Sequence, residues 1–461
     1  MMVLQLPTDF SSLIPAGEQG ELRAQLNRDR RVMLLSGSPV ANQRSETSGV
    51  SARVCRAGSY GFASAPEVSG EALKAVLKSA ENNAAVLDRH LNKGKAARKP
   101  VPRALVSPAV QWVDAEQKAY LDYLRELDGW IATLPNLVSR RLVVFCDSTE
   151  KHLLTGDGAE AHTAIPRCYV YVNLTAETKE GAPVELFKAF GGFGGFDDWF
   201  GDPSALRPEV EQLHAQLMDK REGIYAKAGK FTCILGGELS GMLAHEAVGH
   251  TVEADLVIGG SVGGPNLNKV VASPLVSMTD FASEAFGKPA PLPVYCDDEG
   301  VEAVDVPLIK DGVLVGFMHD RESAERFGQE ARGNARAYSF SDEPLIRMRN
   351  TAVHPGKDKL EDIIASVEDG YYLLNTNNGQ ADTTGEFMFG VTLGYEIKKG
   401  KLGKAILDTT ISGVAFDMLK TVDMVSDEVI WSSSGFCGKK QPMAVGLGGP
   451  ALRCQLTIGG R

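Results

Sequence analysis

The stretch YYLLNTNNGQADTTGEFMFGVTLGYEI, residues 371–397, predicts the fold class most directly. Its two ends, YYLLNT and EFMFGVTLGYEI, are rich in aromatic and aliphatic residues, and the segment between them contains Gly379, Gly385 and two asparagines. Apolar runs of this kind, bounded by Gly and Asn, are typical of β-strands. The stretch therefore predicts two strands in the last part of the chain.

The same strand signals recur from residue 229 to the end of the chain. Further strands are predicted in the segments 231–237, 272–278, 291–300, 313–320 and 452–460. Shorter helices interrupt them, one at 240–256 with Ser240 as its N-cap and one near 359–368. We therefore expect an α+β protein with a β-rich C-terminal domain, residues 229–461, built on a large mixed or antiparallel sheet.

The N-terminal region, residues 1–92, is predicted to be α/β. Residues 44–64 alternate apolar and polar residues around Gly58, which is typical of a β-hairpin. Ser69 then caps a helix with Leu73, Val76, Leu77, Ala80 and Ala84 on one face. The segment 92–103 contains five basic residues and two prolines. This composition favours a solvated linker between domains over a patch for nucleic acid or an acidic partner.

The middle domain, residues 104–228, is predicted to be α+β. A helix is expected near 114–127, buried strands at 140–146 and 168–177, and a polar helix at about 203–222. The segment KAFGGFGGFDDWF (188–200) interleaves glycine with aromatic residues. This pattern favours a loop with a few rings packed into the core, and a mobile lid or substrate platform is the alternative.

Charge and cysteine content limit the classes of protein. The 461 residues contain 48 Lys and Arg against 59 Asp and Glu, a net charge of −11, which disfavours nucleic acid as the main partner. No apolar run reaches about 18 residues, and the N-terminus lacks the basic and apolar regions of a secretory signal, so we expect no membrane span and no signal. The odd number of cysteines, seven, does not suggest a disulfide framework and favours a reducing cytoplasm.

The string LAHEAVGHTVEADL (243–256) places His245, Glu246 and His250 within six residues. Two imidazoles and a carboxylate this close make a candidate zinc site. At roughly 100° per residue, histidines at i and i+5 stand about 140° apart around an ideal helix, so their rings diverge. A shared metal ion therefore requires a wide turn, such as a π-bulge, which Gly249 would tolerate. Two histidines of the core or surface, without metal, remain the alternative.

Glu246 follows the first histidine directly, where a metallopeptidase glutamate takes a proton from metal-bound water. A catalytic zinc ion usually keeps three protein ligands and one open position, so one more ligand must come from elsewhere. Cys437 is a candidate because the nearby Lys439 and Lys440 favour its thiolate, although a free loop cysteine is the alternative. The other candidates are Glu253, Asp255, Cys233, Cys296, Cys454, His319 and His354.

A rival hydrolase pattern occurs at GGSVG (259–263), which fits G-x-S-x-G with Ser261 as nucleophile. That motif needs a strand before it and a helix after it, and the following GGPNLN favours a loop instead. A phosphate-binding loop is also disfavoured because no Lys-Ser/Thr pair follows. For stabilising an oxyanion, the candidates are Lys439, His319 and the backbone amides of residues 259–264.

The chain resembles the TldD/PmbA family, also labelled modulators of DNA gyrase, over nearly its whole length; only the first 30 or so residues match weakly. The family's catalytic, TldD-like branch carries HExxxH and a late cysteine, and its TldE/PmbA-like partner branch lacks the metal ligands. This chain has both elements and so resembles the catalytic branch. The resemblance rests on AHEAVGH followed by EADL, on SGVSARVCRAGSYGFAS, and on the segments 335–356, 369–401 and 435–460.

This resemblance implies a zinc-dependent peptidase. His245, His250 and Cys437 then bind Zn²⁺, and Glu246 is the base that activates a zinc-bound water. It also implies a dimer, either a homodimer or a heterodimer with a TldE/PmbA-like paralogue. The dimer would enclose a cavity in which unfolded or extended peptides are cut with little sequence preference. Such tolerance follows if the substrate is held by main-chain hydrogen bonds, as a strand added to a sheet edge.

The alternative function is that of a non-catalytic partner or scaffold, which the gyrase label suggests. No basic stripe in the sequence supports this role. Asp382 and Glu386, in the segment 379–390, either line a cavity or lie on a strand surface, and we assign them no role.

Overall fold

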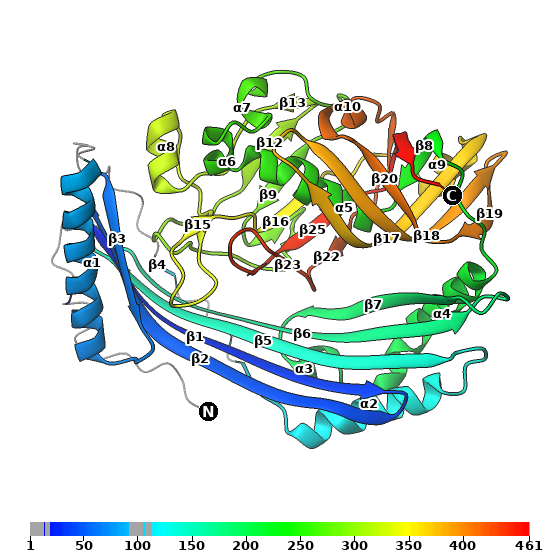
Figure 1. Cartoon of the computed structure of the whole chain (residues 1–461), viewed down its shortest axis with the longest axis horizontal. Coiled ribbons are helices and arrows are strands. Elements are labelled where there is room, and N and C mark those ends of the chain that lie inside the picture. The colour runs from blue at the N-terminus through cyan, green and yellow to red at the C-terminus, as the bar shows by residue number, and fades with distance from the viewer. Residues whose placement is uncertain (1–12, 14–18, 92–104, 107–109, 111, 461) are drawn as a thin grey trace.

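The computed structural model describes residue 13 and residues 19–91, 105–106, 110 and 112–460. Figure 1 shows a long curved sheet, built from the first part of the chain, with a body of shorter strands and helices from the second part lying along one of its faces. The fold is α+β, as predicted. The predicted basic linker at 92–103 falls outside the described residues.

The long sheet has the strand order β3-β2-β1-β5-β6, with β4 and β7 both paired to β6. The predicted hairpin at 44–64 is confirmed, because Val50 to Arg56 pair with Ser59 to Ala65 across the turn at Gly58. Strands from before residue 92 and after residue 104 share this sheet, and the division of the chain there stays a prediction. The strands are β1 (Gly20–Leu35), β2 (Ser38–Arg56), β3 (Ser59–Ala65), β4 (Leu105–Val106), β5 (Ser139–Thr155), β6 (Glu160–Glu177) and β7 (Pro183–Phe193).

Helices bury their apolar sides against the face of the long sheet that points away from the second part of the chain (Figure 1). Ser69 caps α1 (Gly70–Leu91) as predicted, since its Oγ accepts a hydrogen bond from the Ala72 amide at 3.1 Å. The predicted stripe faces the sheet: Leu73, Val76, Ala80 and Ala84 are buried, and Leu77 packs beside them. The predicted helices near 114–127 and 203–222 correspond to α2 (Gln117–Ile131) and to η2 (Pro203–Leu206) with α4 (Arg207–Arg221).

The prediction of a loop at 188–200 is wrong. The first half of the segment belongs to β7, which pairs with β6, and the second half forms α3 (Phe196–Trp199). Its glycines obscure the strand signal, yet one of them is needed for pairing: a Cβ on Gly191 would lie 2.1 Å from the Cys168 carbonyl oxygen. The expectation that aromatic rings enter the core is confirmed for Phe190, Phe196 and Phe200.

The second part of the chain contains two large mixed sheets, where a single large mixed or antiparallel sheet was predicted. One has the order β17-β8-β26-β20-β18-β19, with β21 on β26, and closes on itself because β17 also pairs with β18. Its strands are β8 (Gly229–Leu235), β17 (Asp369–Ala381), β18 (Glu386–Lys398), β19 (Lys401–Ile406), β20 (Thr409–Val414), β21 (Met424–Val425) and β26 (Leu452–Ile458). The other has the order β13-β12-β9-β16-β25-β22, formed by β9 (Met278–Phe281), β12 (Val306–Lys310), β13 (Val313–Leu314), β16 (Asn350–Val353), β22 (Ile430–Ser432) and β25 (Gly446–Gly449).

Three strand predictions in this part are largely wrong. Of the segment 272–278 only Met278 begins a strand, and of 313–320 only Val313 and Leu314 form one. The segment 291–300 contributes a single bridge, between Cys296 and Glu302. These segments have irregular backbone, but their apolar side chains are buried as those of a strand would be. Periodicity of the sequence alone does not distinguish the two cases. The remaining small elements are β10 (Glu284–Ala285), β11 (Lys288–Pro289), β14 (Ala335–Arg336), β15 (Leu345–Ile346), β23 (Phe436–Cys437), β24 (Met443–Ala444), α7 (Gly263–Asn266), α8 (Arg321–Phe327), α9 (Leu360–Ala365) and α10 (Ala415–Leu419).

The helical segment predicted at 240–256 lies between the two sheets and changes its winding along its length. It runs as α5 (Gly237–Met242), the π-helix η3 (Leu243–Gly249), the 3₁₀ turn η4 (His250–Val252) and α6 (Ala254–Ile258). The π-helix contacts β16 and β25 on one side and β17 and β18 on the other. Ser240 is not the N-cap, because the helix begins earlier and the Ser240 Oγ donates to the Gly237 and Pro450 carbonyls.

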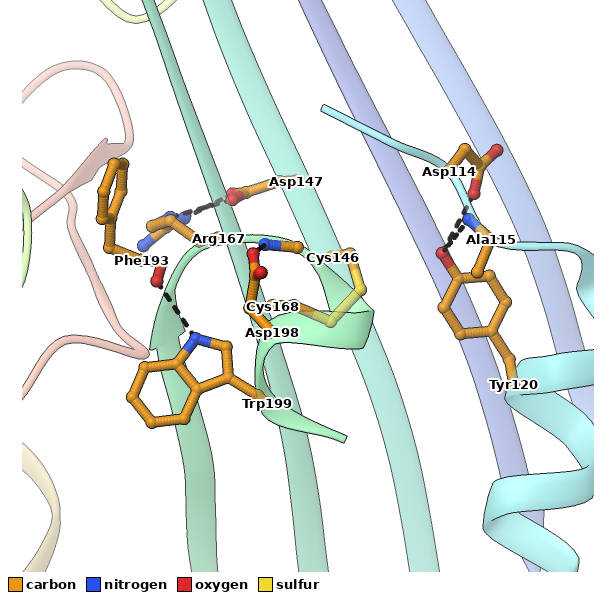
Figure 2. Close-up of a disulfide and its surroundings, with 11 residues drawn as sticks. Asp114, Ala115, Tyr120, Cys146, Asp147, Arg167, Cys168, Phe193, Asp198 and Trp199 are labelled. Atoms are coloured by element: carbon orange, nitrogen blue, oxygen red, sulfur yellow. Dashed lines mark hydrogen bonds and ion pairs between the residues drawn. A yellow bond between two sulfur atoms is a disulfide. The ribbon is translucent and has the colours of Figure 1, made fainter. Parts of the chain in front are cut away.

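Cys146 and Cys168 form a disulfide, which the cysteine count did not predict. The two residues are directly opposite each other on β5 and β6, so the strand register alone brings them together. Figure 2 shows the bond beside the ion pair of Asp147 and Arg167, which follow and precede the two cysteines in sequence. The other cysteines are free in the described part of the chain.

A buried ionic network joins the long sheet to the second part of the chain. Asp298 accepts from Arg23 at 3.1 Å and from Lys151 at 2.7 Å, and Glu299 pairs with Arg53 at 2.5 Å. Removing one member of such a network would leave an uncompensated buried charge, so the two parts are held in one arrangement. Among the described helices, none combines the length and apolarity needed to cross a membrane.

Candidate metal centre

The wide turn that the histidine spacing requires is present as the π-helix η3. It turns His245 and His250 to the same side, with ring centroids 5.0 Å apart and planes inclined by 80°. Gly249 is needed here for space and not for backbone freedom, since its φ is an ordinary −52°. A Cβ at that position would lie 2.1 Å from the Met348 sulfur.

Cys437 comes to the same point from the strand β23. Its Sγ is 3.4 Å from the His250 Nε2. One ligand atom each from His245, His250 and Cys437 lies within 4.8 Å of the other two. The structure therefore brings together the three residues named as ligands in the sequence, although Cys437 is 187 residues from His250.

The environment of His245 fits a metal ligand. The side chain is buried, and neither ring nitrogen has a hydrogen-bond partner in the described part of the chain. Leaving a buried polar group unpartnered costs about 1–3 kcal/mol, so the position needs a compensating interaction. Burial, with the nearby His250 and Arg347, holds the pKa of His245 well below its ordinary value, so the ring is neutral and has a lone pair to offer.

His250 is oriented by a carboxylate. Its Nδ1 lies 2.7 Å from the buried Glu253 Oε2, which leaves Nε2 directed at Cys437. Burial alone would lower the pKa of His250, but the hydrogen bonds to Cys437 and Glu253 raise it to about 10. The contact between the His250 Nε2 and the Cys437 Sγ thus favours a positive charge at this point, carried by a proton or by a metal ion. An imidazole held by a carboxylate on its far nitrogen is the usual arrangement of a metal-binding histidine.

Glu246 lies beside both imidazoles with its carboxylate partly open to solvent. Its oxygens are 3.9 Å from the His245 Nε2 and 3.5 Å from the His250 Nε2. Burial raises its pKa; His250 lowers it and Glu253 raises it further. A carboxylate whose pKa is raised toward neutrality is better matched to accepting and returning a proton.

Arg347 and Lys439 fix the chain that follows Cys437. The buried Arg347 guanidinium donates to the carbonyls of Cys437 at 2.7 Å and Gln441 at 3.0 Å. Lys439 Nζ is shared by Asp255 at 2.8 Å, Glu253 at 3.2 Å and the Ile346 carbonyl at 3.0 Å. With three partners for its three protons, Lys439 is a positioning group, and its prediction as an oxyanion donor is wrong.

Side chains of the long sheet hold the loop before Cys437. The Tyr169 hydroxyl donates to the Ser433 carbonyl and the Tyr171 hydroxyl to the Ser434 carbonyl, both at 2.8 Å. Arg167 donates to the Ser433 carbonyl at 3.1 Å, and its guanidinium stands 4.9 Å from the centre of the Phe436 ring. These contacts span more than 260 residues of sequence, so no local pattern could have predicted them.

The other candidates lie elsewhere. Among the described residues, Cys233, Cys296, Cys454, His319 and His354 belong to no group with metal-binding spacing. Cys233 and Cys454 are opposite each other in the sheet core, and His354 bonds Thr279. The amides of residues 259–264 all donate within the protein, so the prediction that they stabilise an oxyanion is wrong.

Ser261 is not an exposed nucleophile. Its side chain is fully buried, its hydroxyl donates to the Thr251 carbonyl, and the oxygen accepts from the Gly263 amide at 3.2 Å. The helix α6 precedes it where the nucleophile motif requires a strand. The geometry thus disfavours the serine-hydrolase pattern.

Known proteins match this chain along almost all of its described length. Family models match it in three parts: PmbA/TldA metallopeptidase domain 1 at residues 20–84, the central domain at 112–233 and the C-terminal domain at 228–460. A zinc metalloprotease TldD homolog of Saccharolobus solfataricus is 35% identical over 315 residues, 68% of this chain and 68% of that protein. A metalloprotease of Methanothermobacter thermautotrophicus is 29% identical over 463 residues, 96% of this chain and 95% of that protein.

Solved structures share the fold. A Thermotoga maritima protein described as a modulator of a DNA gyrase has a TM-score of 0.75 at 17% identity, covering 96% of both chains. TldE from Thermococcus kodakarensis has a TM-score of 0.73 at 16% identity, covering 96% of this chain and 97% of its own. The matches to the domain models and to the S. solfataricus relative show that this chain belongs to the TldD/PmbA family of metallopeptidases.

Proposed function

We propose that this chain is a zinc-dependent peptidase in which His245, His250 and Cys437 hold the zinc ion and Glu246 is the general base. One observation carries the proposal: a fully buried, unpartnered imidazole converges with a second imidazole and a thiol, and a carboxylate lies beside them. Protein relatives named metalloproteases add support.

The donor set favours zinc over harder cations. Two imidazoles and a thiolate suit Zn²⁺, whereas Mg²⁺ and Ca²⁺ prefer oxygen ligands. The S. solfataricus relative, named a zinc metalloprotease, agrees with this choice. When bound, a zinc ion polarises the peptide carbonyl and makes water more acidic.

Glu246 is proposed to move the proton. Its carboxylate accepts the proton of the attacking water at one oxygen and returns it to the nitrogen of the departing amine, so that no net proton is consumed. His250 stays oriented because Glu253 holds its Nδ1, and Lys439 in turn holds Glu253. His250 and Lys439 thus both compensate the negative charge of Glu253.

The substrate is proposed to be an unfolded or extended peptide. Such a chain can be held by main-chain hydrogen bonds, which carry little sequence preference. An enclosed cavity, formed with a second copy or with a TldE/PmbA-like paralogue, would exclude folded proteins. The fold shared with a TldE structure supports a paralogue as partner.

Metal analysis and a peptide assay test the function together. We expect about one zinc ion per purified chain and cleavage of an unfolded peptide that stops on chelation and returns with added Zn²⁺. A folded protein that contains the sequence of this peptide should not be cut. Full cleavage by metal-free protein would contradict the proposal.

Replacing Glu253 with glutamine is expected to weaken zinc binding by about 10–100-fold, the usual cost of losing an outer partner of a ligating histidine. The amide keeps the size of the side chain but removes the negative charge that faces His250 and Lys439. Competition with a chelator measures the affinity. Glu238→Gln is the control, because Glu238 is a partly buried glutamate in the first turn of α5 whose carboxylate accepts from Asn375.

Removing the hydroxyls of Tyr169 and Tyr171 together is expected to cost about 2 kcal/mol and so to weaken zinc binding about 30-fold. Each hydroxyl bond to the loop before Cys437 contributes about 1 kcal/mol, and about 1.4 kcal/mol is a factor of ten. The same chelator competition measures it. Tyr123→Phe is the control, since the Tyr123 hydroxyl has no hydrogen-bond partner in the described structure. Equal affinity in the double variant and the control would show that the loop needs no such support.

A further inference from the structure

A second group of metal-binding side chains lies on the long sheet. Glu150 and His152 are on β5, and His162 is directly opposite His152 on β6. Strand residues alternate between the faces, so Glu150 and His152 share a face with each other and with the paired His162. The hairpin between β5 and β6 thus brings His162 to Glu150 and His152, although it follows them by ten or more residues in sequence.

This group is separate from the first centre. The intervening Lys151 points to the opposite face, where it pairs with Asp298 of the second part of the chain. Glu150, His152 and His162 therefore lie on the face that carries the helices, and the sheet itself separates them from His245. Neither the peptidase mechanism nor the contact between the two parts of the chain uses them.

The carboxylate of Glu150 is held with one oxygen toward the imidazoles. Its Oε1 is 3.2 Å from the His162 Nε2 and 4.0 Å from the His152 Nε2. Its Oε2 faces Arg28, whose Nη1 is 3.7 Å away and whose guanidinium stands 5.9 Å from the centre of the Trp112 ring. Arg28 compensates one oxygen and leaves the other directed at the two rings.

The imidazole of His152 lacks a hydrogen-bond partner for one of its nitrogens in the described structure. Its Nε2 is buried and has no hydrogen-bond partner in the part of the chain that the structure describes. Burial, with the neighbouring His162, lowers the pKa of His152 to about 4, so its ring is neutral near pH 7. A neutral imidazole nitrogen without a hydrogen-bond partner has a lone pair available, and together with the neighbouring carboxylate oxygen it can coordinate a metal cation.

We propose that Glu150, His152 and His162 form a second binding site for a divalent transition-metal ion. One ligand atom from each lies within 4.8 Å of the other two. Two imidazoles and one carboxylate suit Zn²⁺, Co²⁺, Ni²⁺ or Cu²⁺, and disfavour Mg²⁺ and Ca²⁺. The rings now stack at 3.6 Å with 21° between their planes. Binding therefore requires them to turn about their own side-chain bonds, for which their partial exposure leaves room. We expect this site to be the weaker of the two and to lose its ion during purification.

Titrating the metal-stripped full chain with Co²⁺ distinguishes the two sites. An ion bound by Cys437 has a near-ultraviolet sulfur-to-metal absorption, and an ion bound by imidazole and carboxylate alone has only visible bands. We expect two equivalents of Co²⁺, one of each spectroscopic kind. Cys437→Ala should remove the sulfur band and keep the other equivalent, so the two proposals fail separately.

Variants of the second site complete the test. His152→Gln and Glu150→Gln should each weaken the sulfur-free equivalent at least tenfold while peptide cleavage and the sulfur band stay unchanged. His214→Gln is the control, because in the described structure His214 bonds the Pro135 carbonyl and belongs to neither group. If His152→Gln fails to fold, the isosteric Glu150→Gln decides. A wild-type chain that takes up only the sulfur-bound equivalent, or variants that bind both as the wild type does, would overturn the proposal.

Discussion

Replacing Glu246 with glutamine is expected to lower the rate of peptide cleavage by about 10²–10⁴-fold, the usual contribution of a general base. Glutamine keeps the shape of the side chain beside His245 and His250 but cannot take up a proton. The zinc content should stay at about one ion per chain, because the carboxylate is not among the three proposed ligands. Steady-state cleavage of an unfolded peptide and metal analysis of the same sample measure both quantities.

Ser261→Ala is the informative control for this variant. Its hydroxyl is buried and bonded to the Thr251 carbonyl, so cleavage should continue at the wild-type rate if the protein folds. Cleavage lost in Ser261→Ala and kept in Glu246→Gln would reverse the assignment. A metal-free chain that cuts nothing, folds and binds a partner would instead favour the scaffold function.

The fold could be predicted where one face of an element is buried and its periodicity is clear, but the long strand β1 was not predicted, and β5 and β6 were predicted only over 140–146 and 168–177. The hairpin around Gly58 and the helix after Ser69 carry clear periodic patterns, and both are confirmed. The segment 291–300 has the apolar content of a strand, but its amides at Leu292, Val294 and Asp298 donate to Asn350, Ala282 and Ala335 and form no ladder. Composition cannot reveal such partners, because they are set by contacts distant in sequence. The glycine-rich half of β7 was missed for the opposite reason, since its pairing needs the lack of side chains.

The candidate site could be predicted in part. The i, i+5 spacing of His245 and His250 demanded a π-turn, which the helix contains. The family resemblance named Cys437, whereas spacing alone left seven alternatives open. What could not be predicted is the support: Arg347, Tyr169 and Tyr171 act on the ligand loop through carbonyl contacts across the fold. The disulfide likewise depends on strand register and not on cysteine number.

Replacing Cys437 with alanine is expected to weaken zinc binding by more than about a hundredfold, since losing outer partners alone costs 10–100-fold. The two remaining imidazoles would leave a site with too few ligands to retain the ion through purification. We therefore expect less than one zinc ion in ten chains and a matching loss of peptide cleavage. Added Zn²⁺ should restore little activity.

Cys454→Ala is the matched control, because Cys454 is also a buried, free cysteine of the same domain. It lies opposite Cys233 in the sheet core, where burial raises its pKa well above the ordinary value, and it belongs to no metal-binding group among the described residues. Its loss should cost about 1 kcal/mol of folding free energy and leave zinc unchanged. The comparison separates ligand loss from general destabilisation: equal zinc content in the two variants would remove Cys437 from the site, and a deficit confined to Cys437→Ala would place the sulfur on the metal.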